Sequence, residues 1–415
     1  MPGTDWISGP FGLGGSARST WSPQRTALIV VHHLTAANRL VGDVVPLLEG
    51  DPRVQLFWTT PPGGAFSHSG VEFLRGHDGV VLPWQQAVSH RFELAVAASL
   101  GGGLENVHAP VLVLGHGSGP GKLLFRREGD GPAAPRDVAG AHSGLIAYGR
   151  VVPSLLGVAH HRMRDVLART VPPAAEVAEV VGEPAFDRLT AGADRRAAFR
   201  RALGVGDAQK LVVVSSTWQR NSLLGTRPDL PARLIGELPP AGFRVVVIPH
   251  PGTWVWHGRR QVRAWLGAQG GDPEPGVLPP EDGWQAALVA ADLVIGDHGS
   301  VTYYAAALGR PVLMGAFPKG DVDPASHNAL LGLTAPRLDR GVPLRPQVEE
   351  AIGAHVPERT EWYRSQLTSA PGASATLLRS AMYRLMGLAE PATPARTPPI
   401  ALPRLLPSLS GEGAA

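Results

Sequence analysis

The stretch of sequence that decides the fold is LVIGDHGSVTYYAAALGRPVL, which runs from Leu293 to Leu313. A short apolar run ends at Asp297, small residues follow at the predicted start of a helix, and a Gly-Arg-Pro turn leads into a second apolar run. A buried strand, a helix and another buried strand in this order are typical of a βαβ unit in a parallel sheet. The segment therefore predicts an α/β architecture.

The same alternation occurs in two series along the chain. In the first series, apolar runs at 27–33, 54–60, 80–84 and 110–116 are predicted strands, and 92–99 has a helical pattern. In the second, predicted strands at 210–217, 243–250, 293–297 and 311–314 alternate with predicted helices at 230–238, 256–268, 284–291 and 301–308. Two such series predict two Rossmann-like domains that face each other across a cleft.

These patterns divide the chain into five expected parts. A disordered N-terminus (1–24) precedes an N-terminal Rossmann-like domain (25–182), a C-terminal Rossmann-like domain (183–343), C-terminal helices (344–388) and a disordered tail (389–415). The tail is rich in Pro and Ala, which rarely support a core, so residues beyond Pro391 are expected to be dispensable.

Composition excludes several classes of function. The 415 residues are 44% hydrophobic, enough for more than one core, and the 38 basic residues are nearly balanced by 35 acidic ones, so charge gives no support to nucleic-acid binding. Without cysteine there is no thiolate nucleophile or thiolate metal site. The pairs His32-His33 and His160-His161 are expected to point to opposite faces, so no metal is expected. Neither a signal peptide nor a membrane-length apolar run is found, which predicts a cytoplasmic protein.

Ligands of open parallel sheets bind beyond the carboxyl ends of the strands, so strand ends are the places to look for chemistry. Four segments qualify: 115–122, 215–220, 248–253 and 295–302. The first, GHGSGPGK, lacks the glycine and the Ser or Thr that a phosphate-binding P-loop places around its lysine, and it lacks the glycines that flank a hydrolase serine. It is interpreted either as a small-residue loop that a ligand approaches closely or as a plain turn.

The segment from Asp297 to Ser300 is more specific. The free amides at the predicted helix start, together with the Ser300 hydroxyl, would suit a phosphate group. The alternative is structural: Asp297 would cap the helix and the Gly-Arg-Pro sequence would turn the chain.

This block resembles the donor-binding strand and helix of bacterial CDP-glycerol glycerophosphotransferases (Asp-Tyr-Ser-Ser, then Gly-Lys-Pro-Val). It also resembles that of non-hydrolysing UDP-N-acetylglucosamine 2-epimerases (Asp-Ser-Gly-Gly, then Gly-x-Pro-Val), and both families belong to the GT-B superfamily. Other segments are similar to glycerophosphotransferase motifs in the same order: His116-Gly-Ser118 with Lys122, Gly182-Glu-Pro184 with Asp187, Thr217-Trp218, His250-Pro251 and Pro371-Gly-Ala-Ser374. The similarity spans about 110–388, and the chain looks closest to a branch from GC-rich Gram-positive bacteria.

The resemblance implies a transferase that moves a glycosyl or polyol-phosphate group from a nucleotide-activated donor to a hydroxyl acceptor. It also implies that 25–182 is the acceptor side and 183–343 the donor side, and that the last helix, 374–388, packs near the domain junction. His116 would be the general base and His250 would contact or protonate the donor phosphate, which suits imidazoles that titrate near neutrality. The donor would be held by Asp297, His298, Gly299, Ser300, Thr217 and Arg220, and the loop residues Gly117, Ser118 and Lys122 would bind acceptor or phosphate. No cofactor or metal is required. The acceptor is left open, and peripheral membrane contact through it is one expectation.

Two alternatives stay open at this point. A UDP-sugar 2-epimerase would use similar strand ends but needs acid and base carboxylates, which the sequence does not identify. A non-catalytic nucleotide-binding or regulatory protein is the other alternative, because relatives place a carboxylate for the ribose where this chain has Tyr303-Tyr304. His298 would either add a proton donor to the phosphate site or pack in the protein.

Overall fold

The structure is a computed structural model, and it describes residues 6–10, 18–63, 67–119, 121–123, 144–267, 274–354 and 356–407. Its contacts divide the chain into two compact units. Unit 1 comprises Met1–His116, Ala139–Asp187 and Thr368–Pro398, and unit 2 comprises Gly117–Val138, Arg188–Leu367 and Pro399–Ala415. The chain therefore returns to unit 1 twice after first leaving it.

Unit 1 is built on a parallel sheet of seven strands in the order β3-β2-β1-β4-β5-β8-β9. The strands are β1 (Arg25–Val30), β2 (Val54–Thr59), β3 (Val80–Leu82), β4 (Leu94–Ala97), β5 (Val111–Leu114), β8 (Leu155–Val158) and β9 (Ala178–Val180). β1, β4 and β5 are almost continuous apolar runs, as expected for strands that are covered on both faces.

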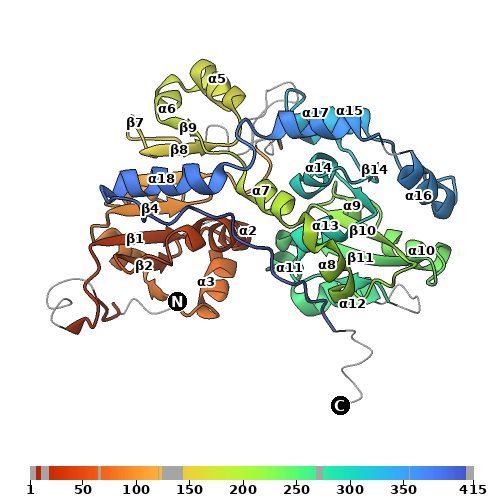
Figure 1. The fold of residues 1–415 in the computed structure, drawn as a ribbon, viewed down its shortest axis with the longest axis horizontal. Helices are drawn as coiled ribbons and strands as arrows, with labels where there is room; N and C mark the ends of the chain where they lie inside the picture. The colour runs from red at the N-terminus through yellow and green to blue at the C-terminus, as the bar shows by residue number, and fades with distance from the viewer. Residues whose placement is uncertain are drawn as a thin grey trace, which may run out of the picture. The chain divides into compact units, whose positions relative to one another are not determined.

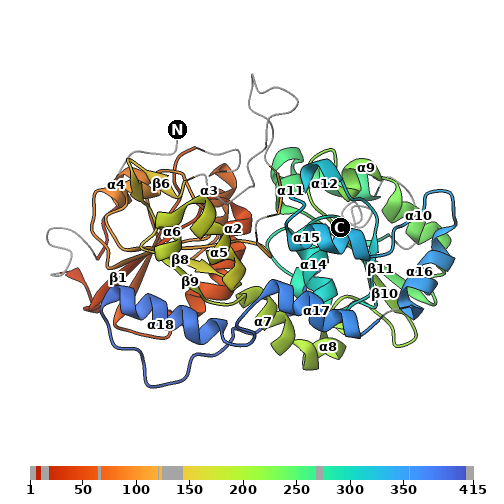
Figure 2. The ribbon, with the colours of Figure 1, turned by 90° about the horizontal axis from the view of Figure 1, so that it is seen from above.

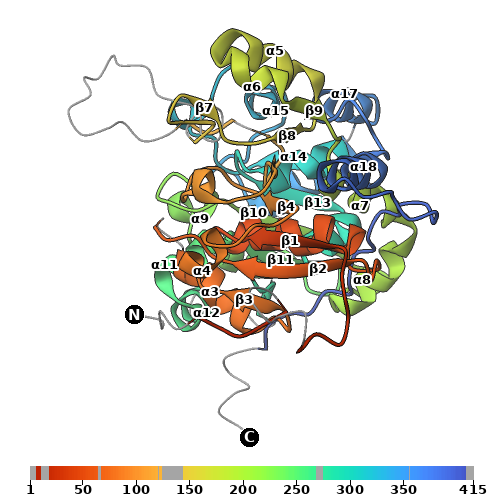
Figure 3. The ribbon, with the colours of Figure 1, turned by 90° about the vertical axis from the view of Figure 1, so that its left-hand side faces the viewer.

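Alternate residues of these strands serve two hydrophobic layers. Ala27 and Ile29 belong to the layer that holds α2 (Leu34–Arg39) and α18 (Ser374–Met386), whereas Leu28 and Val30 belong to the opposite layer with α4 (Trp84–Val88). Figure 1 shows α18 lying along the sheet beside β4. At the other end of the sheet, α5 (His161–Thr170) and α6 (Pro172–Glu176) lie side by side (Figure 3). The sheet is thus sandwiched between helices.

Unit 2 repeats this design with a five-stranded parallel sheet in the order β12-β11-β10-β13-β14. The strands are β10 (Lys210–Ser216), β11 (Phe243–Pro249), β12 (Gly276–Val277), β13 (Leu293–Gly296) and β14 (Val312–Met314). In both sheets the first strand, β1 or β10, is an inner strand, and the order in which strands are added reverses beside it, which is the topology that puts ligands at the strand ends. The predicted α/β class with two Rossmann-like units is confirmed.

Helices cover both faces of the second sheet. One layer joins the strands to α9 (Leu223–Thr226), α10 (Leu230–Glu237), α11 (Pro251–His257), α12 (Arg259–Gly267) and α16 (Leu344–Gly353). Figure 2 shows α10 and α16 side by side. Two further helix pairs belong to this unit. α8 (Arg196–Ala202) packs on α13 (Trp284–Ala290), and α14 (Ser300–Ala307) packs on α17 (Glu358–Leu367).

Several expected elements differ from the structure. The predicted helix at 92–99 is the buried strand β4, because its position between β1 and β5 outweighs the helix propensity of its alanines. The stretch between the two series holds four short strands: β8, β9 and the antiparallel hairpin of β6 (Ile146–Ala147) and β7 (Arg150–Val151). These strands are too short to give a clear pattern in the sequence.

The limits of the two units also differ from the expected domains. The change from unit 1 to unit 2 falls after Asp187 rather than at 182, inside α7 (Pro184–Ala191). The reason is local, because the Asp187 carboxylate accepts hydrogen bonds from Gly372 and Ser374 in unit 1. The predicted C-terminal helices do not form one group, since α16 and α17 belong to unit 2 whereas α18 belongs to unit 1.

The ends of the chain are more ordered than composition indicates. Ile7 exchanges two hydrogen bonds with Gln86, although 1–24 is expected to be disordered. In the expected disordered tail, Ile400 is only 2% exposed and Leu406 donates a backbone hydrogen bond to Val277. A few apolar residues therefore suffice to fix residues 389–407. Residues 1–5, 11–17 and 408–415 lie outside the described part of the chain.

Candidate functional site

In unit 1, His116 follows strand β5 at its carboxyl end. Its Nδ1 lies 2.7 Å from the Ala98 carbonyl oxygen. A carbonyl can only accept, so Nδ1 must carry the proton and the lone pair of the neutral ring lies on Nε2. The side chain keeps an exposed face, yet the protein around the ring lowers the pKa of His116 below 6.5. This combination gives a ring nitrogen that is ready to accept a proton at neutral pH.

A buried ion-pair network supports the strand end beneath His116. The Arg39 guanidinium donates to the Gly115 carbonyl at 3.1 Å and pairs with Asp43 at 2.9 Å and with Glu183 at 2.6 Å. All three charged side chains are almost fully buried, so loss of one partner would leave an uncompensated charge. Sequence reasoning missed Arg39, because nothing local marks it as a partner of residue 183.

Two further histidines lie close to His116 in unit 1. The His33 ring meets the His116 ring edge to face at a centroid distance of 4.8 Å, and the His33 Nδ1 accepts from the amide of Ala36 as a helix cap. The His32 Nε2 lies 3.1 Å from the Gly101 carbonyl, and burial lowers the pKa of His32. The His33 ring therefore packs against His116 and caps α2, and His32 is a half-buried packing residue. Within the described residues, no group of three His, Asp or Glu side chains is arranged to hold a metal ion.

The glycine-rich loop after His116 belongs to unit 2. Ser118 donates its backbone N–H to the Ser300 hydroxyl at 3.0 Å, and its own hydroxyl lies 3.2 Å from the His327 Nε2. Lys122 forms an antiparallel bridge with Val322. At Gly117 a Cβ atom would come within 2.6 Å of the Ser300 Oγ, so a larger residue there would displace the Ser300 hydroxyl. The loop residues predicted for the acceptor side thus lie beside the predicted donor residue Ser300.

Asp297 has a structural role in unit 2. Its side chain is buried, and one carboxylate oxygen accepts from the Thr217 amide, the Thr217 hydroxyl and the Leu223 amide, each at 2.8 Å. The other oxygen accepts from the Gly299 amide at 3.1 Å. These four bonds tie the end of β13 to the end of β10. The carboxylate therefore positions Thr217 and Gly299. It does not cap α14, because the N-cap residue is Gly299 and it makes no side-chain cap bond, so the predicted capping role is not what the structure shows.

His298 is the most unusual side chain of unit 2. It is 7% exposed, and neither ring nitrogen has a hydrogen-bond partner among the described residues. Burial lowers the pKa of His298, and the Lys122 ammonium acts in the same direction, whereas Asp297 and Asp321 oppose the shift. Buried polar groups without partners are costly in a folded protein, so they mark places where a ligand or water supplies the missing bond.

The side chain of Lys122 contacts Gln219 and Trp218, which follow strand β10. Its ammonium donates to the Gln219 side-chain oxygen at 2.7 Å and lies 5.2 Å from the centre of the Trp218 ring. Burial lowers the pKa of Lys122, opposed by Asp321 and Asp297. Gln219 has a backbone φ of 82°, which is rare for a residue other than glycine, and such strain gathers at functional sites. No signal in the sequence distinguishes Gln219 from its neighbours.

His250 caps α11 at the end of β11. Its Nδ1 accepts the amide of Gly252 at 2.9 Å, so in the neutral ring the proton lies on Nε2. The ring is stacked toward Trp218 at a centroid distance of 6.4 Å. His250 and His116 therefore carry their protons on opposite nitrogens: the Nε2 of His250 can donate, whereas the Nε2 of His116 can accept.

The remaining positions singled out in the sequence differ in burial. Arg220 is exposed and makes no ion pair within the described chain. Tyr303 and Tyr304 are buried: the Tyr303 hydroxyl donates to the Tyr363 carbonyl at 3.1 Å, and Tyr304 stacks on Trp284. Both tyrosines are core residues.

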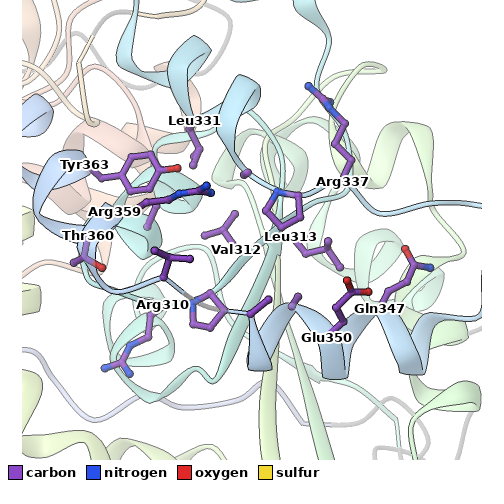
Figure 4. Close-up of a pocket in the computed structure, with 17 residues that line it drawn as sticks. Arg310, Val312, Leu313, Leu331, Arg337, Gln347, Glu350, Arg359, Thr360 and Tyr363 are labelled. Carbon is purple, nitrogen blue, oxygen red and sulfur yellow. The ribbon is translucent and has the colours of Figure 1, made fainter.

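A cavity of about 260 Å³ in unit 2 lies elsewhere. It is lined by residues of β14, α14, α16, α17 and α15 (His327–Thr334), and none of the predicted site residues borders it. Figure 4 shows Arg359 and Tyr363 on one side of it and Gln347 and Glu350 on the other.

Comparison with known proteins places the fold in a class. No family model matches the chain, and no curated protein matches it. Among solved structures, the wall teichoic acid polymerase TagF is similar with a TM-score of 0.59 at 12% identity, covering 88% of this chain and 90% of TagF. A histidine variant of TagF gives a TM-score of 0.60 at 12% identity with the same coverage. The fold is thus similar to that of TagF, which supports the GT-B class.

A TagF variant soaked with CDPG is also similar, with a TM-score of 0.59 at 11% identity and coverage of 88% and 90%. At such identities the likeness describes the fold alone. Within the described residues, no helix has both the length and the apolar character needed to cross a bilayer.

Proposed function

We propose that this protein is a transferase that moves a glycosyl or polyol-phosphate group from a nucleotide-activated donor to a hydroxyl acceptor. The observation that carries the proposal is the surroundings of His298 at the start of α14. A buried imidazole without a hydrogen-bond partner among the described residues, the ammonium of Lys122 and the amides of a helix start gather in one unit. Together they form an environment suited to an anion such as a diphosphate.

The start of α14 is suited to this role because no side chain caps it. Its N-cap residue is Gly299, which offers no side-chain acceptor to the first amides of the helix. A Cβ atom at Gly299 would come within 2.6 Å of a Thr217 methyl carbon, so a larger residue there would displace the Thr217 side chain. The amides that Gly299 cannot satisfy would bind donor phosphate oxygens, with His298 and Lys122 as further donors.

The two histidine tautomers support distinct steps. The Nε2–H of His250 would donate to the phosphate oxygen that leaves with the nucleotide, and the Nε2 of His116 would remove the proton of the acceptor hydroxyl. The acceptor oxygen would form its bond to the transferred group as the bond to the nucleotide phosphate breaks. The motifs shared with glycerophosphotransferases and the fold of TagF favour a polyol-phosphate donor such as CDP-glycerol within this class.

Binding of the donor can be tested with Lys122→Met. Nucleoside diphosphates and their sugar or glycerol derivatives should raise the melting temperature of the wild-type protein, because they bind the native state. Loss of a charged hydrogen bond should weaken binding by about 10- to 100-fold. Lys319→Met is the matched control, since this exposed lysine lies in the same unit. A protein that no such nucleotide stabilises would contradict the proposal.

Turnover can be tested with His116→Asn. This variant should bind the donor like the wild type and lose on the order of 10²- to 10⁴-fold in rate, the typical contribution of a positioned general base. A wild-type rate in this variant would exclude His116 as the base. Nucleotide binding without turnover on any hydroxyl acceptor would favour the non-catalytic alternative, and release of a sugar epimer would favour the epimerase.

A further inference from the structure

Two helices of unit 2 present large aromatic side chains to solvent. Trp256 on α11 is 65% exposed and Trp265 on α12 is 47% exposed, whereas Trp254, also on α11, is 3% exposed and packs in the core. A core role therefore explains Trp254 and leaves the other two tryptophans unexplained. Exposure of the large apolar surface of an indole ring to water is unfavourable. An exposed pair of indoles therefore marks a surface that meets something less polar than water.

The two tryptophans belong to one surface. The His257 ring follows Trp256 directly and contacts the Trp265 ring edge to face at a centroid distance of 4.9 Å. Val262 and Leu266 are buried and hold α12 on the sheet, which leaves the opposite side of the helix outward. The tryptophan–arginine surface is defined here as Trp256, His257, Arg259, Arg260 and Trp265.

The charge of this surface is positive. Helix α12 has the sequence RRQVRAWLG, with three arginines and no acidic residue. Arg259 pairs with Glu281, and Arg263 donates to the Pro407 carbonyl at 2.8 Å. Arg260 is exposed and forms no ion pair with any described residue. A cation of this kind beside exposed indoles is complementary to a surface that is both anionic and partly apolar.

We infer that the tryptophan–arginine surface binds the interface of an anionic membrane. Indole rings are stable at the level of lipid headgroups, where the ring meets the acyl boundary and its N–H meets polar groups. Guanidinium groups pair with lipid phosphates in two-point geometry. Helix α12 would lie flat on the bilayer, as interfacial helices do. This inference rests on the surface itself and does not depend on the proposed function.

The test uses the full chain and phospholipid vesicles. The protein should sediment with vesicles that contain phosphatidylglycerol and much less with pure phosphatidylcholine, and added salt should weaken the binding. Lipids with a bromine label near the headgroup should quench part of the tryptophan fluorescence. In the double variant Trp256→Ser and Trp265→Ser, binding and the vesicle-dependent quenching should both be lost. Arg260→Glu should lower the partition coefficient by at least about fivefold.

Trp362→Ser is the matched control, because Trp362 is 39% exposed on α17 in the same unit. It should bind vesicles like the wild type, and unchanged circular dichroism should show that each variant is folded. The inference is overturned if phosphatidylglycerol vesicles do not bind the wild type. It is also overturned if the folded double variant binds them equally well, or if the double variant changes only the oligomeric state, which would mark a contact between copies of this chain.

Discussion

At the scale of single residues, the position of a proton decides what each histidine can do. His116 and His250 differ only in which partner meets Nδ1: a carbonyl at the first and an amide at the second. The sequence places both at strand ends but cannot indicate the tautomer of His116, since the carbonyl of Ala98 follows another strand, β4. His298 is different again, because neither of its nitrogens has a hydrogen-bond partner in the part of the chain that the structure describes.

This burial predicts how His298 affects stability. Its folded pKa is lowered below the ordinary 6.5, so the unfolded chain takes up a proton first as the pH falls. The contribution of a neutral buried His298 to stability is therefore complete above pH 6.5 and declines as the pH falls below it. In His298→Leu, denaturant unfolding measured across this range should show a shallower loss of stability in acid. The same replacement at exposed His257 is the control, and an unchanged slope in His298→Leu would contradict the prediction.

At the scale of elements, one carboxylate links two strands of the second sheet. Asp297 joins the carboxyl ends of β13 and β10 through bonds to the amides of Thr217, Leu223 and Gly299. Strands predicted from apolar runs, such as β10 and β13, were found because their burial on both faces requires such runs. The strand β4 was not found, because a short run rich in alanine fits a buried helix equally well.

Replacing this carboxylate should destabilise the sheet end. Asp297→Ala leaves buried amides without an acceptor, and a hydrogen bond to a charged group contributes about 1.5–3 kcal/mol. We expect urea unfolding to show a loss of at least about 3 kcal/mol, with weaker nucleotide binding as a consequence. The exposed Asp339, which accepts from the Gly341 amide, gives the control variant Asp339→Ala. A loss below about 1 kcal/mol at Asp297 would mean that water replaces the carboxylate.

At the scale of the whole molecule, the chain passes repeatedly between its two units. The segments 117–123 and 399–407 belong to unit 2 and α18 belongs to unit 1, although their neighbours in the sequence lie in the other unit. Sequence patterns found the two sheets because each is built from local βαβ steps. They could not assign these crossing segments, because the residues that receive them are distant in the sequence, as Ser300 is from Ser118.

The tail gives a direct test of this arrangement. Truncation after Pro398 removes Ile400, whose burial contributes about 1.5–3 kcal/mol, and the carbonyl that accepts from Arg195. Such a protein should melt at a lower temperature in a calorimeter, whereas truncation after Pro407 keeps these contacts and serves as the control. Equal melting temperatures for the two truncations would restore the expectation that the tail is dispensable.

The position of α18 has a consequence for synthesis on the ribosome. Leu378, Met382 and Met386 complete the hydrophobic layer over β1 and β4, yet they are translated nearly two hundred residues after Asp187 closes the main part of unit 1. The nascent first unit must wait with this sheet face only partly covered, by α2 and the residues that follow it, while the second unit is made. A fragment of residues 1–187 should therefore aggregate when expressed alone and become soluble when residues 368–398 are supplied in trans. The last helix of the chain thus sets the moment at which its first unit can finish folding.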